Sequence, residues 1–171
     1  MTVADQIASW LDEKGITHAF GIVGGGNVVL WDAIHRLGRT KLICNHHEQA
    51  AVMAATYYFR TANKLALALV TTGAGSTNAI TGVVAAHMDS IPVLVISGNE
   101  ASKYMGKQTR VWGVQGYDSV RAVEGVTKDS MRIMDGRDAP SLLEYAHRTT
   151  LAGRQGPVWV DIPKDVQGAN V

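Results

Sequence analysis

The sequence contains one cysteine, Cys44, among its 171 residues. A single cysteine excludes an internal disulfide, and a chain without disulfides is typical of a reducing compartment. Free cysteine is usually buried as a small apolar residue, and Cys44 ends a short apolar run. We therefore expect Cys44 to be a buried structural residue and not a nucleophile.

The sequence also lacks an excess of charge, because its 16 basic and 15 acidic side chains give a formal net charge of +1. This balance provides no electrostatic basis for binding nucleic acid or an anionic membrane, so we predict neither partner. The first residues lack the basic start and apolar core of a signal peptide, and no apolar run is long enough to span a membrane. We therefore expect a cytoplasmic protein.

Four segments of the chain repeat the order strand, loop and helix. Their strands are short apolar runs at residues 18–23, 42–44, 65–70 and 91–96, and weaker strand patterns follow at residues 126–133 and 156–163. Parallel strands need right-handed crossovers, so we predict an α/β fold: a doubly wound, mostly parallel sheet of about six strands with helices on both faces. The length fits one domain over residues 1–171.

Helix and loop signals frame these strands. Thr2 can cap a first helix, with Asp5 favourable in its first turn and Gly15 at its end. Residues 140–151 have the apolar spacing of a further helix. The pattern weakens over residues 104–117, where we predict a mostly irregular segment of the kind that is usually functional in a compact domain.

Glu48 lies at the junction between the strand 42–44 and the helix that follows. Ligands bind at the carboxyl ends of strands in an open parallel sheet, so Glu48 is a candidate functional centre. The local pattern favours another interpretation, in which Asn45 is the N-cap and Glu48 completes a capping box. A functional role requires burial among apolar neighbours such as Val23 and residues 50–55, where a carboxyl group can share a proton with a bound base.

The two histidines before Glu48 do not predict a metal site. His46 and His47 are adjacent, so on a helix they would point about 100° apart and could not share one ligand-binding face. The other histidines are scattered without ligand spacing. We predict no metal site in this chain.

Two glycine loops follow predicted strands, at residues 24–26 and 73–75. The first matches a dinucleotide fingerprint only weakly, since Val29 replaces its third glycine, and a dinucleotide site is kept as an alternative. Together with Glu48, the loops describe a cleft lined by backbone and suited to a flat heteroaromatic ring that exchanges a proton. The sequence offers no acidic pair for Mg²⁺ and no basic cluster for phosphates.

Four motifs carry a family resemblance. They are residues 45–51 (NHHEQAA), 71–82 (TTGAGSTNAITG), 88–98 (MDSIPVLVISG) and 156–167 (GPVWVDIPKDVQ). Their order and spacing resemble the N-terminal pyrimidine-binding domain of thiamine diphosphate enzymes of the acetolactate synthase type. The resemblance covers essentially the whole chain and implies a lyase or transferase that decarboxylates a 2-oxo acid and joins the product to a second carbonyl or to a proton.

The resemblance also implies residue roles. The glutamate in the position of Glu48 hydrogen-bonds the pyrimidine N1′ of thiamine diphosphate and promotes the tautomerisation by which the cofactor loses its thiazolium C2 proton. Gly73-Ala74-Gly75 replaces the usual Gly-Pro-Gly of the family. The implied cofactor-binding residues are Val23, Gly24, Glu48, Ala74 and Asn78, and the implied catalytic residues are Glu48 and Gln115, of which Gln115 faces the substrate.

This family binds Mg²⁺ and diphosphate through a Gly-Asp-Gly motif, which the sequence lacks. The resemblance therefore implies that a domain outside this chain holds Mg²⁺, with a diphosphate-binding domain or subunit as partner and a homodimer or homotetramer as the assembly. A full enzyme of this type can bind FAD, which is not predicted for this chain. Two alternatives stay open: a stand-alone alpha subunit of a two-chain decarboxylase, similar to sulfopyruvate decarboxylase, and a non-catalytic binding or assembly module.

Overall fold

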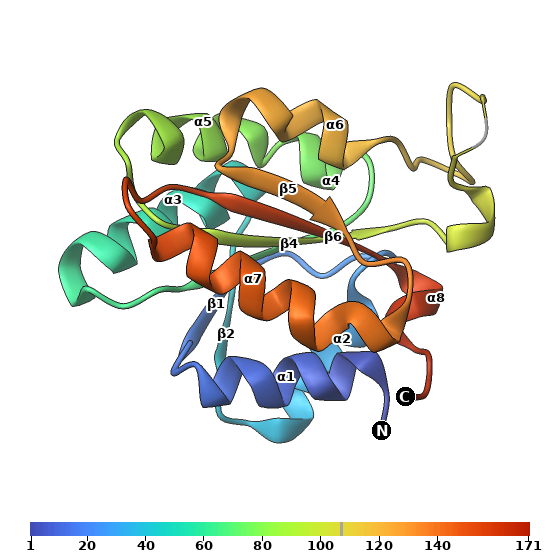
Figure 1. Ribbon diagram of the computed structural model, residues 1–171, viewed down its shortest axis with the longest axis horizontal. Helices are drawn as coiled ribbons and strands as arrows, with labels where there is room; N and C mark the ends of the chain where they lie inside the picture. Colours follow the sequence, from blue (N-terminus) through green and yellow to red (C-terminus); the bar gives the residue numbers. More distant parts are fainter. Residues whose placement is uncertain (107) are drawn as a thin grey trace.

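The computed structural model describes residues 1–106 and 108–171 and is built around a six-stranded sheet (Figure 1). The strand order is β2-β1-β3-β4-β6-β5, and every neighbouring pair is parallel. The predicted doubly wound parallel sheet is therefore confirmed. The strands are β1 (His18–Gly21), β2 (Lys41–Cys44), β3 (Leu67–Val70), β4 (Leu94–Asn99), β5 (Asp129–Arg132) and β6 (Val158–Pro163).

Helices cover both faces of the sheet, as predicted (Figure 1). One face carries α1 (Val3–Glu13), α2 (Val28–Leu37) and α7 (Ala139–Leu151), and the other carries α3 (Glu48–Ala62), α5 (Ile80–Met88) and α6 (Ser119–Val123). The shorter elements are α4 (Ala74–Thr77), α8 (Lys164–Gln167) and the 3-10 turns η1 (Ser102–Tyr104), η2 (Glu124–Val126) and η3 (Gly136–Asp138). None of the helices in the described part of the chain has the length and apolar character needed to cross a membrane.

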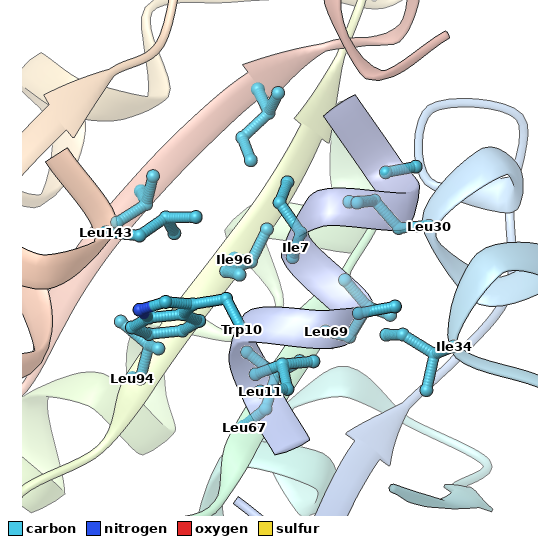
Figure 2. Packing of buried hydrophobic residues seen from close by; sticks show 14 of the residues in the cluster. Ile7, Trp10, Leu11, Leu30, Ile34, Leu67, Leu69, Leu94, Ile96 and Leu143 are labelled. Carbon is cyan, nitrogen blue, oxygen red and sulfur yellow. The ribbon is translucent and has the colours of Figure 1, made fainter. Parts of the chain in front are cut away.

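Two apolar clusters form the core, one on each face of the sheet. Side chains alternate along a strand, so Leu67 and Leu69 of β3 enter one cluster while Ala68 and Val70 enter the other. This alternation explains why the central strands read as uninterrupted apolar runs. Figure 2 shows the first cluster, in which side chains of α1, α2 and α7 meet those of β3 and β4.

The first helix begins with a reciprocal capping box. The Thr2 hydroxyl accepts a hydrogen bond from the Asp5 amide at 3.2 Å, and the Asp5 carboxylate accepts one from the Thr2 amide at 2.9 Å. Gly15 follows the helix with φ of 66°, a left-handed conformation that favours glycine. The predicted start and end of this helix are confirmed.

Two local expectations are wrong and a third is confirmed. Residues 74–77 form a helical turn, α4, where the sequence predicted a loop, because Ser76 and Thr77 amides bond back to the Gly73 carbonyl. The prediction that the segment 104–117 is mostly irregular is confirmed for its described residues, where Tyr104 ends η1 and Trp112 and Gly116 form an isolated bridge. Lys107 lies outside the described residues. Cys44 is exposed, so its predicted burial is wrong; β2 is an edge strand with a partner on one side only.

We expect Leu69→Ala to lower the free energy of unfolding by about 2–5 kcal/mol, because Leu69 is fully buried and truncation leaves a cavity in the first cluster. Urea denaturation followed by tryptophan fluorescence measures this loss. Met88→Ala is the control, since Met88 is 72% exposed and its truncation should change stability by less than about 0.5 kcal/mol. Equal effects of the two substitutions would contradict this packing.

The pKa of Asp5 falls from 3.8 to about 2, first through the hydrogen bond from the Thr2 amide and then through that from Arg36. Because the folded pKa lies below the unfolded one, this stabilisation is complete above pH 4 and is lost as the pH falls towards 2. We expect Asp5→Asn to cost about 1 kcal/mol at pH 7 and progressively less below pH 4, as measured by urea unfolding. Glu13→Gln on the same helix is the control, and a pH-independent cost in Asp5→Asn would refute the assignment.

Candidate functional site

The strand order places a topological switch point at the carboxyl edge of the sheet. After β1 the chain moves outward to β2, and it returns to the other side of β1 to form β3. The connections that leave β1 and β3 therefore run in opposite directions. In open α/β sheets, the crevice that takes a ligand lies at such a switch point. Residues 22–27 and 71–78 border this crevice, and α3 begins beside it with Glu48.

Glu48 is the first residue of α3, so the predicted capping box with Asn45 is wrong. Asn45 continues the strand direction, because its amide bonds to the Gly21 carbonyl of β1 at 2.9 Å. His47 is extended and is the N-cap, with its Nδ1 accepting from the Gln49 amide at 3.2 Å. The helix thus starts later than the local pattern predicts, and the Glu48 side chain is free for contacts outside its own helix.

Within the described part of the chain, one oxygen of the Glu48 carboxylate accepts a hydrogen bond and the other does not. Glu48 is 7% exposed, and its Oε2 accepts a hydrogen bond from Nδ2 of Asn78 at 3.0 Å. Among residues 1–106 and 108–171, none donates a hydrogen bond to Oε1. Asn78 therefore fixes the orientation of the carboxylate and leaves a second oxygen available to a ligand.

Glycines keep the free oxygen of Glu48 accessible. A Cβ atom on Gly75 would lie 3.2 Å from Glu48 Oε1 and 2.5 Å from the Thr71 methyl carbon. Thr71 also joins the two loops, because its hydroxyl accepts from the Gly26 amide at 3.0 Å and a Cβ atom on Gly24 would come within 2.6 Å of the same hydroxyl. The structure thus brings both glycine loops together beside Glu48.

The remaining predicted site residues lie around the same edge in different environments. Val23 is 52% exposed and lines an apolar groove with Trp31 and Cys44, and so adds little to the burial of Glu48. Ala74 is exposed at the start of α4. Gln115 is also exposed, and its Nε2 donates to the Thr72 carbonyl at 3.2 Å. Glu48 and Asn78 are therefore in direct contact, while Gln115 borders the loop that carries Asn78.

A buried polar cluster supports this edge and was missed from the sequence. The fully buried Asp161 accepts hydrogen bonds from Ser97 at 2.6 Å, Asn99 at 2.9 Å and Arg132 at 2.6 Å. Burial lowers the pKa of Arg132, but its hydrogen bonds to Asp161 and Asp118 outweigh this effect and raise it overall. An acid inside the apolar run of β6 was the available signal, because a buried carboxylate requires partners.

The chemistry of the site suits a planar, weakly basic ring. A buried carboxyl group with one free oxygen can share a proton with a ring nitrogen, and glycine backbones leave room for a flat ligand. His46 and His47 are exposed, and no group of three potential metal ligands occurs in the described part of the chain. The donor set therefore fits the pyrimidine part of thiamine diphosphate and supplies no ligand cluster for a metal-bound diphosphate.

Comparison of the sequence with known proteins identifies a family and several relatives. Residues 1–121 match the family model of the thiamine pyrophosphate enzyme, N-terminal TPP binding domain. The acetolactate synthase large subunit of Haemophilus influenzae is 40% identical over 167 residues, which cover 98% of this chain and 28% of that protein. The isozyme 3 large subunit of Escherichia coli is 37% identical over 163 residues, with 95% and 28% covered. The chloroplastic acetolactate synthase of Arabidopsis thaliana is 32% identical over 164 residues, with 96% and 24% covered.

Fold and site together define an α/β domain that presents a buried carboxylate in a switch-point crevice. The chain belongs to the thiamine pyrophosphate enzymes, as the N-terminal TPP binding domain of that family. The family resemblance seen in the sequence is therefore confirmed. The chain spans between 24% and 28% of the length of the three relatives above, which extend well beyond the segment that it matches.

We expect Gly75→Ala to lower the free energy of unfolding by about 1–3 kcal/mol, because the new methyl group would overlap the Thr71 side chain. Urea denaturation measures this cost. Gly125→Ala is the matched control, since no atom lies within 4 Å of a Cβ atom there. If Gly75→Ala were as stable as the control, the close approach of α4 to Thr71 would be wrong.

Proposed function

We propose that this chain is the pyrimidine-binding half of a thiamine diphosphate-dependent 2-oxo acid decarboxylase and carboligase of the acetolactate synthase type. The observation that carries the proposal is the Glu48 carboxylate, which is buried at the switch point and whose Oε2 accepts a hydrogen bond from Asn78. The family match and the acetolactate synthase relatives support it. Thiamine diphosphate, when bound, supplies the carbanion chemistry that such a reaction needs.

Glu48 has the central role in this proposal. Its free Oε1 exchanges a proton with N1′ of the pyrimidine, and its burial strengthens that hydrogen bond by excluding competing water. Asn78 keeps the carboxylate in one orientation, since its amide can donate to Oε2. This arrangement ties the protonation of the ring to a single fixed side chain.

The other proposed site residues contribute shape rather than charge. Gly24 provides close packing beside Thr71, while Val23 and Ala74 present small apolar surfaces at the two loops. Gln115 is the proposed residue on the substrate side, where its amide can donate to a carboxylate or carbonyl oxygen. Its position beside Thr72 supports this role.

The proposed site is one half of a larger one. Mg²⁺ and the diphosphate group would be held by a diphosphate-binding domain or subunit, in a homodimer or homotetramer. The greater length of the relatives supports such a partner. FAD is not proposed for this chain, and a cytoplasmic location stays a prediction.

The acetolactate synthase relatives favour this proposal over the alternatives kept from the sequence. A stand-alone subunit of a two-chain decarboxylase and a non-catalytic module each lack a supporting relative among those described above. The family match likewise favours thiamine diphosphate over a dinucleotide.

We expect Glu48→Gln to lower kcat for pyruvate turnover by about 10²–10⁴-fold, because glutamine cannot exchange a proton with N1′. The assay uses the enzyme assembled with its diphosphate-binding part, thiamine diphosphate and Mg²⁺, and measures carbon dioxide release and acetolactate formation. Glu13→Gln, which removes an exposed acid of α1, is the control and should retain full activity.

Full activity of Glu48→Gln would remove Glu48 from the mechanism. Turnover by this chain without a diphosphate-binding part would contradict the half-site proposal. Absence of thiamine diphosphate binding in the assembled wild-type protein would favour a non-catalytic module instead.

A further inference from the structure

Glu100 is a buried acid that the proposed reaction does not use. It follows β4 directly and is 6% exposed. Its Oε2 accepts a hydrogen bond from Nζ of Lys164 at 2.8 Å, so an ion pair joins the end of β4 to the start of α8. Burying a carboxylate is costly unless it is paired, and here the paired oxygen faces Lys164 while the other faces the segment 112–116.

The segment 112–116 forms a closed turn around the Glu100 carboxylate. Trp112 and Gly116 exchange two backbone hydrogen bonds of 2.8 Å, which close the turn. The amide of Val114 donates to Glu100 Oε1 at 3.3 Å. Cβ atoms on Gly113 and Gly116 would lie within 2.9 Å and 2.8 Å of Glu100 atoms, so the turn packs on this side chain at both ends.

Charge strengthens this contact. Burial works to raise the pKa of the Glu100 carboxyl, but the hydrogen bond and charge of Lys164 and the amides of Val114 and Gln115 lower it below its usual value overall. The carboxylate is therefore ionised at neutral pH, and hydrogen bonds to a charged acceptor are stronger than those to a neutral one.

The same turn carries Gln115 at its exposed side. The side-chain Nε2 of Gln115 donates to the Thr72 carbonyl, and a Cβ atom on Gly73 would lie 2.8 Å from the backbone carbonyl oxygen of Gln115. The turn thus contacts Glu100 on one side and residues 72–73 on another. The position of Gln115 relative to the crevice depends on both contacts.

Other contacts hold the flanks of the turn and not its centre. The Arg132 guanidinium lies 4.9 Å from the centre of the Trp112 ring, and Asn99 donates to the Tyr117 carbonyl at 3.1 Å. Between these flanks, the interior of the turn contacts Glu100.

We infer that Glu100, paired with Lys164, is a positioning residue that holds the turn 112–116 and thereby sets the place of Gln115 at the edge of the crevice. This inference rests on the proposed function insofar as it gives Gln115 a substrate-facing role. Its structural part, that Glu100 holds the turn, can be tested without any turnover.

The first experiment measures hydrogen exchange of residues 112–116 by mass spectrometry in the assembled protein. Glu100→Leu removes the acceptor, and we expect about tenfold faster exchange in the turn, as expected from losing hydrogen bonds to a charged group. Glu100→Gln keeps the size and one acceptor oxygen, so it should give an intermediate increase. Glu124→Gln, which removes an exposed acid of η2, should leave exchange unchanged.

The second experiment measures steady-state kinetics of the same variants with pyruvate. We expect Glu100→Leu to raise KM for pyruvate about tenfold, with a smaller rise in Glu100→Gln and unchanged affinity for thiamine diphosphate, because the Glu48 contacts are not altered. Recovery in the glutamine variant separates this role from a general loss of folding, and that variant also serves if Glu100→Leu does not fold.

The outcomes are distinguishable. Unchanged exchange of the turn in both Glu100 variants overturns the inference whatever the enzyme does. A loosened turn with an unchanged KM overturns the positioning role. A loosened turn in the Glu100 variants, together with no thiamine diphosphate-dependent turnover by the assembled wild-type protein, supports the structural part and counts against the proposed function.

Discussion

The parallel pairing of β1 with β3 is the constraint on which the rest of the structure depends. In the sequence β2 comes between β1 and β3, but in the sheet it lies on the far side of β1. The connections after β1 and β3 therefore run in opposite directions, and such a switch point is where open α/β sheets bind ligands. Glu48 follows the carboxyl end of β2 and therefore lies at the same edge. A different strand order with the same residues would scatter the glycine loops and Glu48 over separate parts of the surface.

Glycines allow the chain to approach closely at this edge, because they carry no side chain. Gly75 lies beside the side chains of Glu48 and Thr71, and the Gly26 amide donates to the Thr71 hydroxyl, so the glycine main chains of both loops pack against the Thr71 side chain. Glycine loses more conformational entropy on folding than other residues, and the packing of the sheet offsets this loss. The result is a buried acid that a flat ligand can reach, while Asn78 prevents the acid from turning away.

Polar groups in the second half of the sheet connect the core to the crevice. Asp161 joins β6, β4 and β5 through Asn99 and Arg132, and Glu100 continues this chain of contacts to the turn that carries Gln115. Each of these buried charges is paired, as a low-dielectric interior requires. The proposed substrate side of the site is therefore positioned by ion pairs, and the proposed cofactor side by glycine packing and one amide.

The sequence predicted the parallel α/β class, the six strands, the limits of the first helix and the family, because apolar runs, capping residues such as Thr2 and four spaced motifs are local properties of the chain. It also pointed to Glu48, Asn78 and Gln115 as residues of one edge. The folded structure was needed to show that Glu48 contacts Asn78 rather than capping its own helix and that Cys44 is exposed on an edge strand. It was also needed to show which partners the buried Asp161 and Glu100 have. Those outcomes depend on strand order and on contacts between segments distant in sequence. The acid inside the apolar run of β6 indicated that Asp161 needs partners, but no local pattern specifies which residues they are.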